Sequence, residues 1–205
     1  MIHPHFLLPL RRARLYVWFI RRSGFMSTHV RIERYTSLPS TEALKAGLEC
    51  VFFTSSNTQV FSSDDARSKF KERWLGRYLQ HDPHYAYVAL SEMNDVVGYL
   101  IGSTDDPAIT SRFADLAYDQ TFGALSQNYP AHLHVNIAPH HRGCGLGAEL
   151  IERFVADLRK GCVPGVHVVT SKNARNVGFY NRNGFREIAA NGVGEREFVL
   201  LARKL

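Results

Sequence analysis

The stretch HHRGCGLGAELIERF, residues 140–154, decides the fold of this chain. It places Gly143, Gly145 and Gly147 at alternate positions, directly before a segment whose apolar residues have helical spacing. Glycine adopts positive φ angles that other residues avoid, at an entropic cost of about 0.5–1 kcal/mol each. A chain tolerates that cost where something must approach the backbone closely. The stretch therefore predicts a loop that receives a ligand and opens a helix.

A strand–helix–strand unit is expected around this loop. The helix covers LGAELIERFVADLRK, residues 146–160, and its apolar residues fall on one face. The apolar runs HLHVNI (132–137) before it and VHVVT (166–170) after it are typical of strands. This order predicts a βαβ unit at the centre of a sheet. The expected buried face of the helix consists of Leu146, Leu150, Ile151, Phe154, Val155 and Leu158.

The rest of the chain supplies further strands and helices. Two apolar runs joined by EMND, residues 92–95, are typical of a β-hairpin. The connection 104–130 is long enough to suggest a lid or a binding loop. The element order predicts an α/β or α+β fold with mixed strand directions. We expect strands at 28–35, 85–91, 96–103, 186–190 and 196–204, helices from about residue 41, over 62–80 and within 173–184, and a polar loop at 55–61.

The composition fits one globular domain in a reducing compartment. The chain has 205 residues, of which 45% are hydrophobic, so it can bury a substantial core. Its three cysteines, Cys50, Cys144 and Cys162, are odd in number and show no CxxC spacing. That pattern argues against a disulfide framework or a zinc ribbon and favours a cytoplasmic protein.

The net charge of +6 is concentrated in the first 25 residues, which hold five arginines and no acid. The other 180 residues carry +1, so the sequence predicts no basic surface for nucleic acid. The longest apolar run of the first segment, Leu15–Ile20, is too short to span a membrane. A membrane-surface or targeting helix stays open for this segment. We interpret residues 1–25 as a basic, apolar extension upstream of a working domain over 26–205.

Three interpretations of the glycine stretch compete. In the first, the glycines only end a strand and open a helix, although two would suffice for that. The second is a dinucleotide fingerprint, because residues 143–148 fit Gly-x-Gly-x-x-Ala; that motif should follow its strand directly, with an acid ending the next strand. Here APHHR intervenes and the next strand ends in VVTSK. The third, a pyrophosphate cradle of backbone N–H groups at a helix N-terminus, fits best.

Two motifs resemble those of the GNAT superfamily of N-acetyltransferases. Residues 142–147, Arg-Gly-Cys-Gly-Leu-Gly, are similar to its Gln/Arg-x-x-Gly-x-Gly/Ala motif. The element order agrees with the GNAT fold from about Val30 to the C-terminus. The resemblance implies a central mixed, mostly antiparallel β-sheet with helices on both faces. The second signature, Asn-x₆-Tyr-x₃-Gly-Phe, is matched by Asn173, Tyr180, Gly184 and Phe185.

The resemblance implies acetyl-CoA as the cosubstrate and no metal. The backbone of residues 135–137 should pair with the pantetheine arm, the glycine loop should hold the pyrophosphate, and Asn173 should hydrogen-bond the arm. Cys144 lies in the pyrophosphate loop, so a covalent relay through it is not expected. The implied cofactor-binding residues are Val135, Asn136, Ile137, Arg142, Gly143, Cys144, Gly145, Leu146, Gly147, Ala148, Asn173 and Tyr180.

The implied reaction is direct attack of an amine on the thioester, with Tyr180 as general acid for the leaving thiolate. Similar bacterial sequences, and the acetyltransferase-like C-terminal domain of animal O-GlcNAc hydrolase, carry Asp where this chain has Asn136. An asparagine does not accept a proton at neutral pH. Strand alternation puts His132, His134 and Asn136 on one face. His134 is the candidate base because of its intrinsic pKa; a histidine that is only hydrogen-bonded inside the sheet is the equal alternative.

The sequence predicts an enzyme that moves an acetyl group to a primary amine of a small molecule or protein. A GNAT-fold module that binds acyl-CoA without transfer stays the alternative, because Asn136 replaces an acid. Loops 55–61 and 104–130 are expected to set the acceptor. Dimers are common in the family, so a homodimer is one expected state. The acids that would suit a cationic amine, or form a solvated face, are Asp105, Asp106, Asp115 and Asp119; the histidines considered and set aside as a metal site are His132, His134, His140 and His141.

Overall fold

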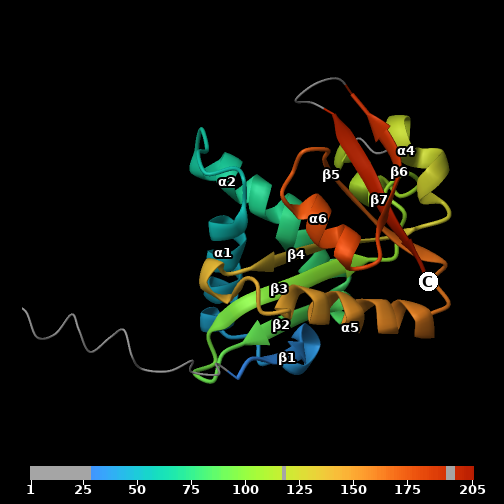
Figure 1. Cartoon of the computed structure of the whole chain (residues 1–205). Helices are drawn as coiled ribbons and strands as arrows, with labels where there is room; N and C mark the ends of the chain where they lie inside the picture. The colour runs from blue at the N-terminus through green and yellow to red at the C-terminus, as the bar shows by residue number, and fades with distance from the viewer. Residues whose placement is uncertain (1–28, 117–118, 193–196) are drawn as a thin grey trace, which may run out of the picture.

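The computed structural model describes residues 29–116, 119–192 and 197–205, so the predicted extension 1–25 lies outside the described residues. They form a seven-stranded sheet in the order β1-β2-β3-β4-β5-β7-β6 (Figure 1). Among the described strands β4 and β5 are parallel, and the other neighbours are antiparallel. The strands are β1 Arg31–Arg34, β2 Ala86–Leu90, β3 Val96–Ser103, β4 Ala131–Ile137, β5 Gly165–Ser171, β6 Arg186–Asn191 and β7 Phe198–Lys204.

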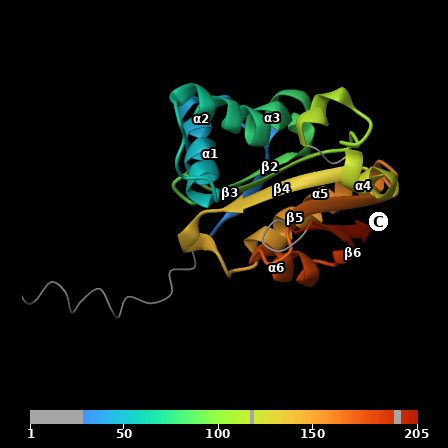
Figure 2. The same ribbon diagram turned by 90° about the horizontal axis from the view of Figure 1, so that it is seen from above.

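Helices cover both faces of this sheet, as predicted (Figure 2). Helices α1, α2 and α3 lie on one face, and α5 and α6 lie on the other. Thr41 and Ser63 cap α1 and α2, because their hydroxyl oxygens accept from the N–H groups of Leu44 and Ala66, each at 3.1 Å. The helices are α1 Glu42–Ser55, α2 Asp64–Lys71, α3 Arg77–His81, α4 Asp119–Ser126, α5 Leu146–Lys160 and α6 Asn176–Arg182.

Each face of the sheet has its own hydrophobic core. Side chains alternate along β2 and β3, so Tyr87 and Leu100 point toward α5, while Val88 and Tyr99 point toward α1 and α3. The α5 core is centred on Phe154, which is fully buried. All the residues predicted for the apolar face of α5 are buried, so the expected βαβ unit β4–α5–β5 is confirmed.

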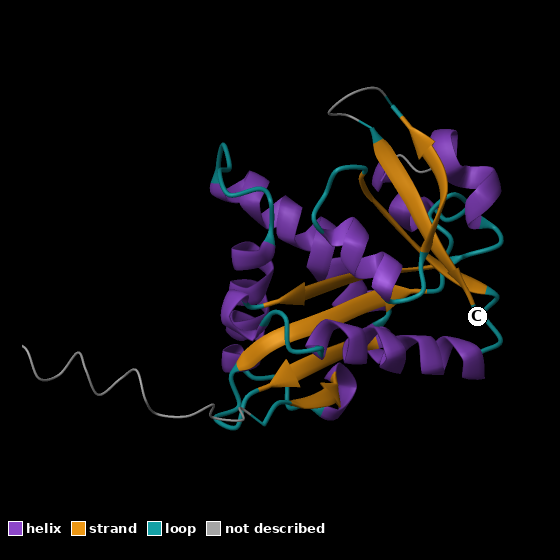
Figure 3. Ribbon diagram, viewed as in Figure 1, coloured by secondary structure: helices purple, strands orange, loops and turns teal. Residues whose placement is uncertain are grey.

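The sheet splits between β4 and β5. These two strands pair only at Ala131 with Val166 and at His132 with His167. Beyond that point β4 continues along β3 as far as Ile137, and β5 continues along β7. Figure 3 shows the two groups of strands, β1–β4 and β5–β7, running in different directions. The second half of β4 therefore has one edge that no described strand covers.

The structure differs from the sequence prediction in three places. The first strand begins at Arg31 and ends at Arg34, because its pairing with β2 stops there and Tyr35–Ser37 form a 3₁₀ turn. The predicted helix over 62–80 contains a π-helical turn, Glu72–Gly76, between α2 and α3. The connection 104–130 contains two helical segments, a 3₁₀ segment, Ser111–Leu116, followed by α4. Periodicity alone does not distinguish a π turn from an α turn.

Within the described part of the chain, we find no helix that is both long and apolar enough to cross a membrane.

Candidate active site

The glycine loop between β4 and α5 forms an open cradle of backbone N–H groups. Gly143 and Gly145 have φ angles of 83° and 84°, and no atom lies within 4 Å of the place where a Cβ would project from either. Ala148 donates its N–H to the Gly145 carbonyl at 2.9 Å. The N–H groups of residues 143–147 have no acceptor among the described residues. Together with the positive end of α5, they suit an anionic group such as a pyrophosphate.

Gly147 connects the two predicted motifs. A Cβ on Gly147 would lie 3.0 Å from the ring of Phe179, so α6 packs against the first turn of α5. Leu146 and Gly147 are buried, whereas residues 143–145 are exposed. The cradle residues therefore divide into an outward-facing loop and a buried turn that holds the loop against α6.

The uncovered edge of β4 leads directly to this cradle. Val135, Asn136 and Ile137 are half-buried and pair with β3 but not with β5. An extended ligand can add to such an edge through backbone hydrogen bonds, as another strand would. An arm that lies along β4 and ends in a pyrophosphate fits this arrangement, which is the shape of the acetyl-CoA that the sequence resemblance implies.

Arg142 folds back onto the sheet. Its Nε donates to the Ile137 carbonyl at 2.8 Å, and its Nη2 donates to the Ser55 hydroxyl at 3.4 Å. Ser55 also donates to the Ile137 carbonyl, at 3.3 Å, so the end of α1 contacts the end of β4. Arg142 therefore holds the base of the glycine loop, and its guanidinium is engaged at the end of β4.

Cys144 and the neighbouring histidines lie on the surface of the loop. The Cys144 thiol is exposed and lies 2.9 Å from the His141 carbonyl. His140 and His141 belong to a 3₁₀ turn after β4, apart from His132 and His134 of the strand. No group of three or more His, Cys, Asp or Glu side chains in the described residues is arranged to hold a metal ion.

The predicted polar face of β4 contacts tyrosines from neighbouring elements. Nε2 of His134 lies 3.1 Å from the hydroxyl of Tyr78, and Nε2 of His132 lies 3.0 Å from the same oxygen. The amide of Asn136 donates to the hydroxyl of Tyr99 at 2.7 Å. His132, His134 and Asn136 therefore share one face, as strand alternation predicts, and that face is the one covered by α1–α3.

Burial sets the protonation state of this face. Burial lowers the pKa of His134 to about 4, and the charge of Arg77 acts in the same direction. Burial also lowers the pKa of His132 well below its ordinary value, with His167 and His134 adding to the effect. Burial raises the pKa of the Tyr99 phenol, against the hydrogen bond from Asn136. Both histidines are therefore neutral imidazoles at neutral pH.

Tyr180 and Asn173 lie on the other side of the split. Tyr180 is buried in the α5 core against the rings of Phe179 and Phe185, with centroid distances of 5.3 and 5.4 Å. Asn173 is exposed in the turn after β5. His134 belongs to the α1–α3 face, so the opening between β4 and β5 separates the predicted base from the predicted acid.

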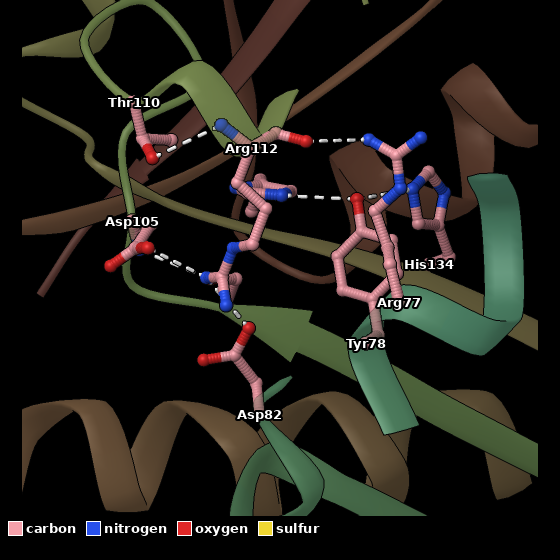
Figure 4. Close-up of polar contacts among 9 residues, drawn as sticks. Arg77, Tyr78, Asp82, Asp105, Thr110, Arg112 and His134 are labelled. Carbon is pink, nitrogen blue, oxygen red and sulfur yellow. Dashed lines mark hydrogen bonds and ion pairs between the residues drawn. The ribbon is translucent and has the colours of Figure 1, made fainter. Parts of the chain in front are cut away.

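Two acids of the connection 104–130 form ion pairs with arginines. Arg112 bridges Asp105 at 2.7 Å and Asp82 at 2.9 Å, as Figure 4 shows. Arg77 forms two hydrogen bonds of 2.7 Å with the carboxylate of Asp115. These ion pairs hold the connection against α3, and the arginines neutralise carboxylates that a cationic amine would otherwise meet.

The other two acids of the predicted cluster are Asp106 and Asp119. Asp106 is buried, and its Oδ1 accepts from the Ser126 hydroxyl at 2.8 Å. The side chain of Asp119 lies outside the described residues. That this cluster attracts a cationic acceptor stays a prediction; in the structure Asp105 and Asp115 are paired with arginines and Asp106 is buried.

A cavity of about 450 Å³ opens beside the end of α1. Phe53, Gln59, Phe61 and Arg67 are among the residues that line it, so part of the loop predicted to set the acceptor contributes to its wall. The Arg67 guanidinium lies 3.6 Å from the ring centroid of Phe53, a cation–π contact. Because Ser55 joins α1 to β4, this cavity lies on the α1 side of the split.

Sequence reasoning missed the aromatic residues that surround His134. The rings of Trp74 and Tyr78 each lie 5.2 Å from its ring, edge to face. Their four-residue spacing puts both on one side of a helix, which the sequence pattern does indicate. Nothing in that pattern indicates that the helix crosses β4 at a histidine.

Comparisons with known proteins agree with this geometry. A family model described as "Acetyltransferase (GNAT) family" matches residues 51–185. A crystal structure of SsHAT has 22% sequence identity and a TM-score of 0.66, and the match covers 85% of this chain and 98% of that one. The ribosomal-protein-alanine N-acetyltransferase from Brucella melitensis has 19% identity and a TM-score of 0.54, covering 85% and 99%.

A third similar structure contains ligands. It is the NatC complex bound to Gag peptide and CoA, with 13% identity and a TM-score of 0.57, covering 86% of this chain and 99% of that one. At these identities the solved structures show a common fold, and the family match is what connects the fold to a chemistry.

Proposed function

The chain belongs to the acetyltransferase (GNAT) family, and we propose that its acetyl acceptor is a primary amine, carried by a small molecule or by a protein. Family membership makes the chain an acetyl-CoA-dependent acetyltransferase. Two of the similar structures support an amine acceptor, since one is named as an N-acetyltransferase and another holds CoA together with a peptide. A screen of small amines and peptides distinguishes a small-molecule acceptor from a protein acceptor.

The observation that carries the proposal is the continuity of the β4 edge with the cradle. The backbone of residues 135–137 would pair with the extended arm, and the N–H groups of residues 143–147 would hold the pyrophosphate. Gly143 and Gly145 leave room for phosphate oxygens because no side chain stands there. Leu146, Gly147 and Ala148 complete the helix start, while Arg142 holds the loop base. Asn173 would contact the arm from the turn after β5.

The acetyl group would then lie in the split between β4 and β5. A backbone N–H on the uncovered edge of β4 would stabilise the oxyanion as the amine attacks. His134 would accept the proton that the amine nitrogen releases, and Tyr180 would protonate the leaving thiolate. Asn136 would orient the acceptor from beside Tyr99, because its amide can hydrogen-bond but not take a proton.

The low pKa of His134 limits which form of the acceptor it can serve. With its pKa held at about 4 by burial, His134 is in its base form at neutral pH but is a weak base. His134 can accept the proton of the attacking amine once the C–N bond has begun to form, because the nitrogen has then become acidic. The acceptor should therefore bind as a neutral amine, and kcat/KM should rise with pH up to the pKa of the amine itself.

The test begins with acetyl-CoA binding measured by thermal unfolding of the full chain. A ligand at 100 times its dissociation constant stabilises by about 2.7 kcal/mol, which for a chain of this size is a shift of roughly 5–10 °C. Gly145→Glu fills the cradle with a negative side chain and should abolish the shift. Gly123→Ala, in α4 and away from the cradle, is the matched control and should keep it.

A screen of amines and peptides, read by release of the CoA thiol, then identifies the acceptor. Thiol release with at least one primary amine and none with the corresponding tertiary amine supports the proposal. An acetyl-CoA shift that Gly145→Glu retains would remove the cradle from the site. A shift with NAD but not with acetyl-CoA would restore the dinucleotide interpretation of the glycines.

The cysteines support the cytoplasm as the compartment of this enzyme. Cys50, Cys144 and Cys162 are all exposed and unpaired. Free exposed thiols persist where thiol reductants are abundant. Cell fractionation with an antibody against the native protein checks this assignment.

A further inference from the structure

The cavity between the end of α1 and the start of α2 has a wall that the acetyl-transfer chemistry described above does not use. Its volume is about 450 Å³. Small-molecule sites in proteins have volumes of about 300–1,000 Å³, so this cavity is of the size that holds one small ring system. The side chains of its wall indicate which kind of ring it suits.

Phe61 turns inward from a loop that is otherwise exposed. It is half-buried, whereas residues 57–60 and 62–65 are exposed and its neighbour Val60 is 88% exposed. The centroid of the Phe61 ring lies 5.8 Å from that of Phe53, at an interplanar angle of 84°, and 5.3 Å from that of Phe70. Phe53 and Phe70 pack against the core on the α1–α3 face. The apolar part of the cavity wall is therefore aromatic.

Hydrogen bonds hold the loop in this shape. Nε2 of Gln59 donates to the carbonyl of Phe53 at 3.0 Å and to the carbonyl of Ser56 at 2.5 Å. The N–H of Thr58 donates to the Ser56 hydroxyl at 3.1 Å. The cavity is therefore largely pre-formed, as small-molecule sites usually are.

A guanidinium forms a flat part of the wall. Arg67 lies over the ring of Phe53, 3.6 Å from its centroid, and its Nη1 donates to Glu49 at 3.0 Å. Lys71 contacts the same carboxylate at 2.7 Å. Arg67 also lines the cavity, and its side chain is 44% exposed. A guanidinium is planar, so the face turned away from Phe53 is open to a second flat group.

The charges of the wall favour an uncharged ligand group. Its charged side chains are Arg67 and Asp64, one of each sign. Asp64 lies in the first turn of α2, where the helix N-terminus favours an acid. An electron-rich ring on the guanidinium gains a cation–π attraction that a saturated ring lacks. The wall therefore suits an uncharged aromatic group.

This cavity lies close to the uncovered half of β4. Phe53 is two residues before Ser55, whose hydroxyl donates to the Ile137 carbonyl at 3.3 Å. Trp74, in the π-helical turn that follows α2, has its ring 5.2 Å from the ring of His134. Figure 2 shows α1, α2 and α3 together on this face of the sheet. A short chain can therefore join a ring in the cavity to an amine in the split.

We propose that the cavity holds an aromatic ring of the acceptor, stacked on Arg67 and against the edge of Phe61, so that the acceptor is an arylalkylamine. The inference rests on the proposed function, because it names the class of primary amine whose nitrogen reaches His134. It agrees with an acceptor that binds as a neutral amine, since Arg67 disfavours a second cation nearby. The ring supplies binding, and the alkyl chain carries the nitrogen to the acetyl group.

Binding of three alcohols to the full-length protein, with CoA present, tests the cavity without any acetyl transfer. Indolylethanol, phenylethanol and cyclohexylethanol share one chain and carry a hydroxyl in place of the amine. Titrations followed by NMR of the ligand give the dissociation constants. The indole should bind about two- to fivefold more tightly than the cyclohexyl compound, with phenyl between them, because cation–π attraction is strongest for indole. Equal dissociation constants, or tightest binding of the saturated ring, overturn the proposal.

Arg67→Gln tests whether the guanidinium causes this preference. Glu49 keeps its ion pair with Lys71 in the variant, so the fold should be retained. The indole and cyclohexyl dissociation constants should become nearly equal, with the cyclohexyl value within about twofold of wild type. Arg153→Gln is the matched control, because it also breaks an exposed pair with a glutamate, Glu149 at 3.0 Å on α5, and it should keep the wild-type preference.

Phe61→Leu is the second variant, because it keeps an apolar side chain and removes the ring edge. It should also weaken the preference for the aromatic alcohols, while binding of the cyclohexyl alcohol is nearly kept. A preference that both Arg67→Gln and Phe61→Leu retain places the ring elsewhere and overturns the proposal. The wild-type series needs no variant, so it decides the preference even if a variant does not fold.

Acetyl transfer to the matching amines connects the cavity to the reaction. The value of kcat/KM should rise in the order n-butylamine, cyclohexylethylamine, phenylethylamine, tryptamine. Arg67→Gln should raise the KM for the aromatic amines and keep kcat within about twofold, because the ring contact is the same in the ground state and the transition state. A polyamine, a plain alkylamine or a peptide as the best acceptor overturns the proposal.

These outcomes separate the inference from the proposed function. A protein that releases the CoA thiol with no amine contradicts the proposed function, while the alcohol series still decides what the cavity binds. Thiol release with primary amines but without a preference for aromatic ones contradicts the inference alone.

Discussion

The two sides of the split sheet build their parts of the site from different groups. On the α5 side the groups that we propose to face the ligand are backbone N–H groups, exposed by Gly143 and Gly145. On the α1–α3 side they are side chains: His134 is hydrogen-bonded to Tyr78, and Asn136 is hydrogen-bonded to Tyr99. A backbone cradle depends on a few consecutive residues, whereas a side-chain network depends on helices that meet the strand from elsewhere in the chain.

The difference predicts that one side of the split binds the cosubstrate and the other governs the chemical step. Backbone amides do not titrate, so the α5 side should bind acetyl-CoA with little dependence on pH or on neighbouring charges. Neutral buried histidines do titrate, so the α1–α3 side should govern the chemical step and respond to acid. Each prediction below perturbs one side and measures whether the other side changes.

The largest expected effect is loss of stability in mild acid. The pKa values of His132, His134 and His167 are all lowered in the folded chain, chiefly by burial. The unfolded histidines bind protons as the pH falls below about 6.5, and the folded ones do not. Stability is therefore complete above pH 6.5 and decreases toward lower pH, by about 1.4 kcal/mol per pH unit for each histidine.

Urea unfolding between pH 7.5 and 5 measures this slope. His132→Gln should remove about one proton from the number taken up on unfolding; His84→Gln, at an exposed position, is the control for a histidine substitution outside the buried group. Asp115 and Asp157 have lowered pKa values, so the stability that their carboxylates contribute is lost only in more acidic solution. The pKa of Asp82 is raised by burial, so protonation of this group in acid solution opposes the trend. An unfolding free energy that stays constant from pH 7 to 5.5 would contradict the burial of neutral histidines.

The second effect concerns catalysis. His134→Ala should lower kcat by about 10²–10⁴-fold at saturating acceptor, the usual contribution of a general base. The thermal shift with acetyl-CoA should persist, because the cradle lies on the other side of the split. His84→Ala is the matched control. Full kcat in His134→Ala would assign the proton to water and leave His134 as a packed residue of the sheet.

The cradle was predictable from the sequence because its information is local. Three alternate glycines before an amphipathic helix require positive φ angles and open space, and the structure has both at Gly143 and Gly145. The buried face of α5 follows from helical periodicity alone. The strand alternation that put His132, His134 and Asn136 on one face is equally local.

The other side was not predictable, because its partners are distant in the sequence. Tyr78 is 56 residues from His134, and Asn136 is 37 residues from Tyr99. Their contacts depend on the angle at which α3 crosses β4 and on the register between β3 and β4, which no periodicity specifies. The same reason applies to Asp105 and Asp115, which look like free acids in the sequence until Arg112 and Arg77 are brought to them.

A third, smaller effect tests the cradle itself. Gly145→Ala should raise the KM for acetyl-CoA roughly tenfold and leave kcat nearly unchanged. A Cβ in the left-handed region costs about 1–2 kcal/mol, and relief of that strain would turn the N–H groups away from the pyrophosphate. Gly123→Ala is the control, because Gly123 lies in α4 and its added Cβ would make only a 3.4 Å contact with Ala108. An unchanged KM would mean that binding does not depend on the φ angle at Gly145.

The smallest effect comes from Asp115→Asn, which perturbs the side-chain face by charge alone. Asp115 neutralises Arg77, and Arg77 lowers the pKa of His134. Without the carboxylate, the unpaired guanidinium should lower the pKa of His134 further, seen by NMR titration of the imidazole. The cost in stability should stay below about 1 kcal/mol, because Asp115 is 45% exposed and screened by solvent.

Since His134 is already in its base form at neutral pH, kcat of Asp115→Asn at pH 7.5 should stay within about twofold of wild type. Asp65→Asn breaks the exposed ion pair with Lys69 on α2 and should leave the pKa of His134 unchanged. Acetyl-CoA should bind both variants equally, because no backbone amide of the cradle changes. A His134 pKa that rises in Asp115→Asn would mean that Arg77 does not act on the imidazole through its charge, and the two sides of the sheet would then differ in geometry alone.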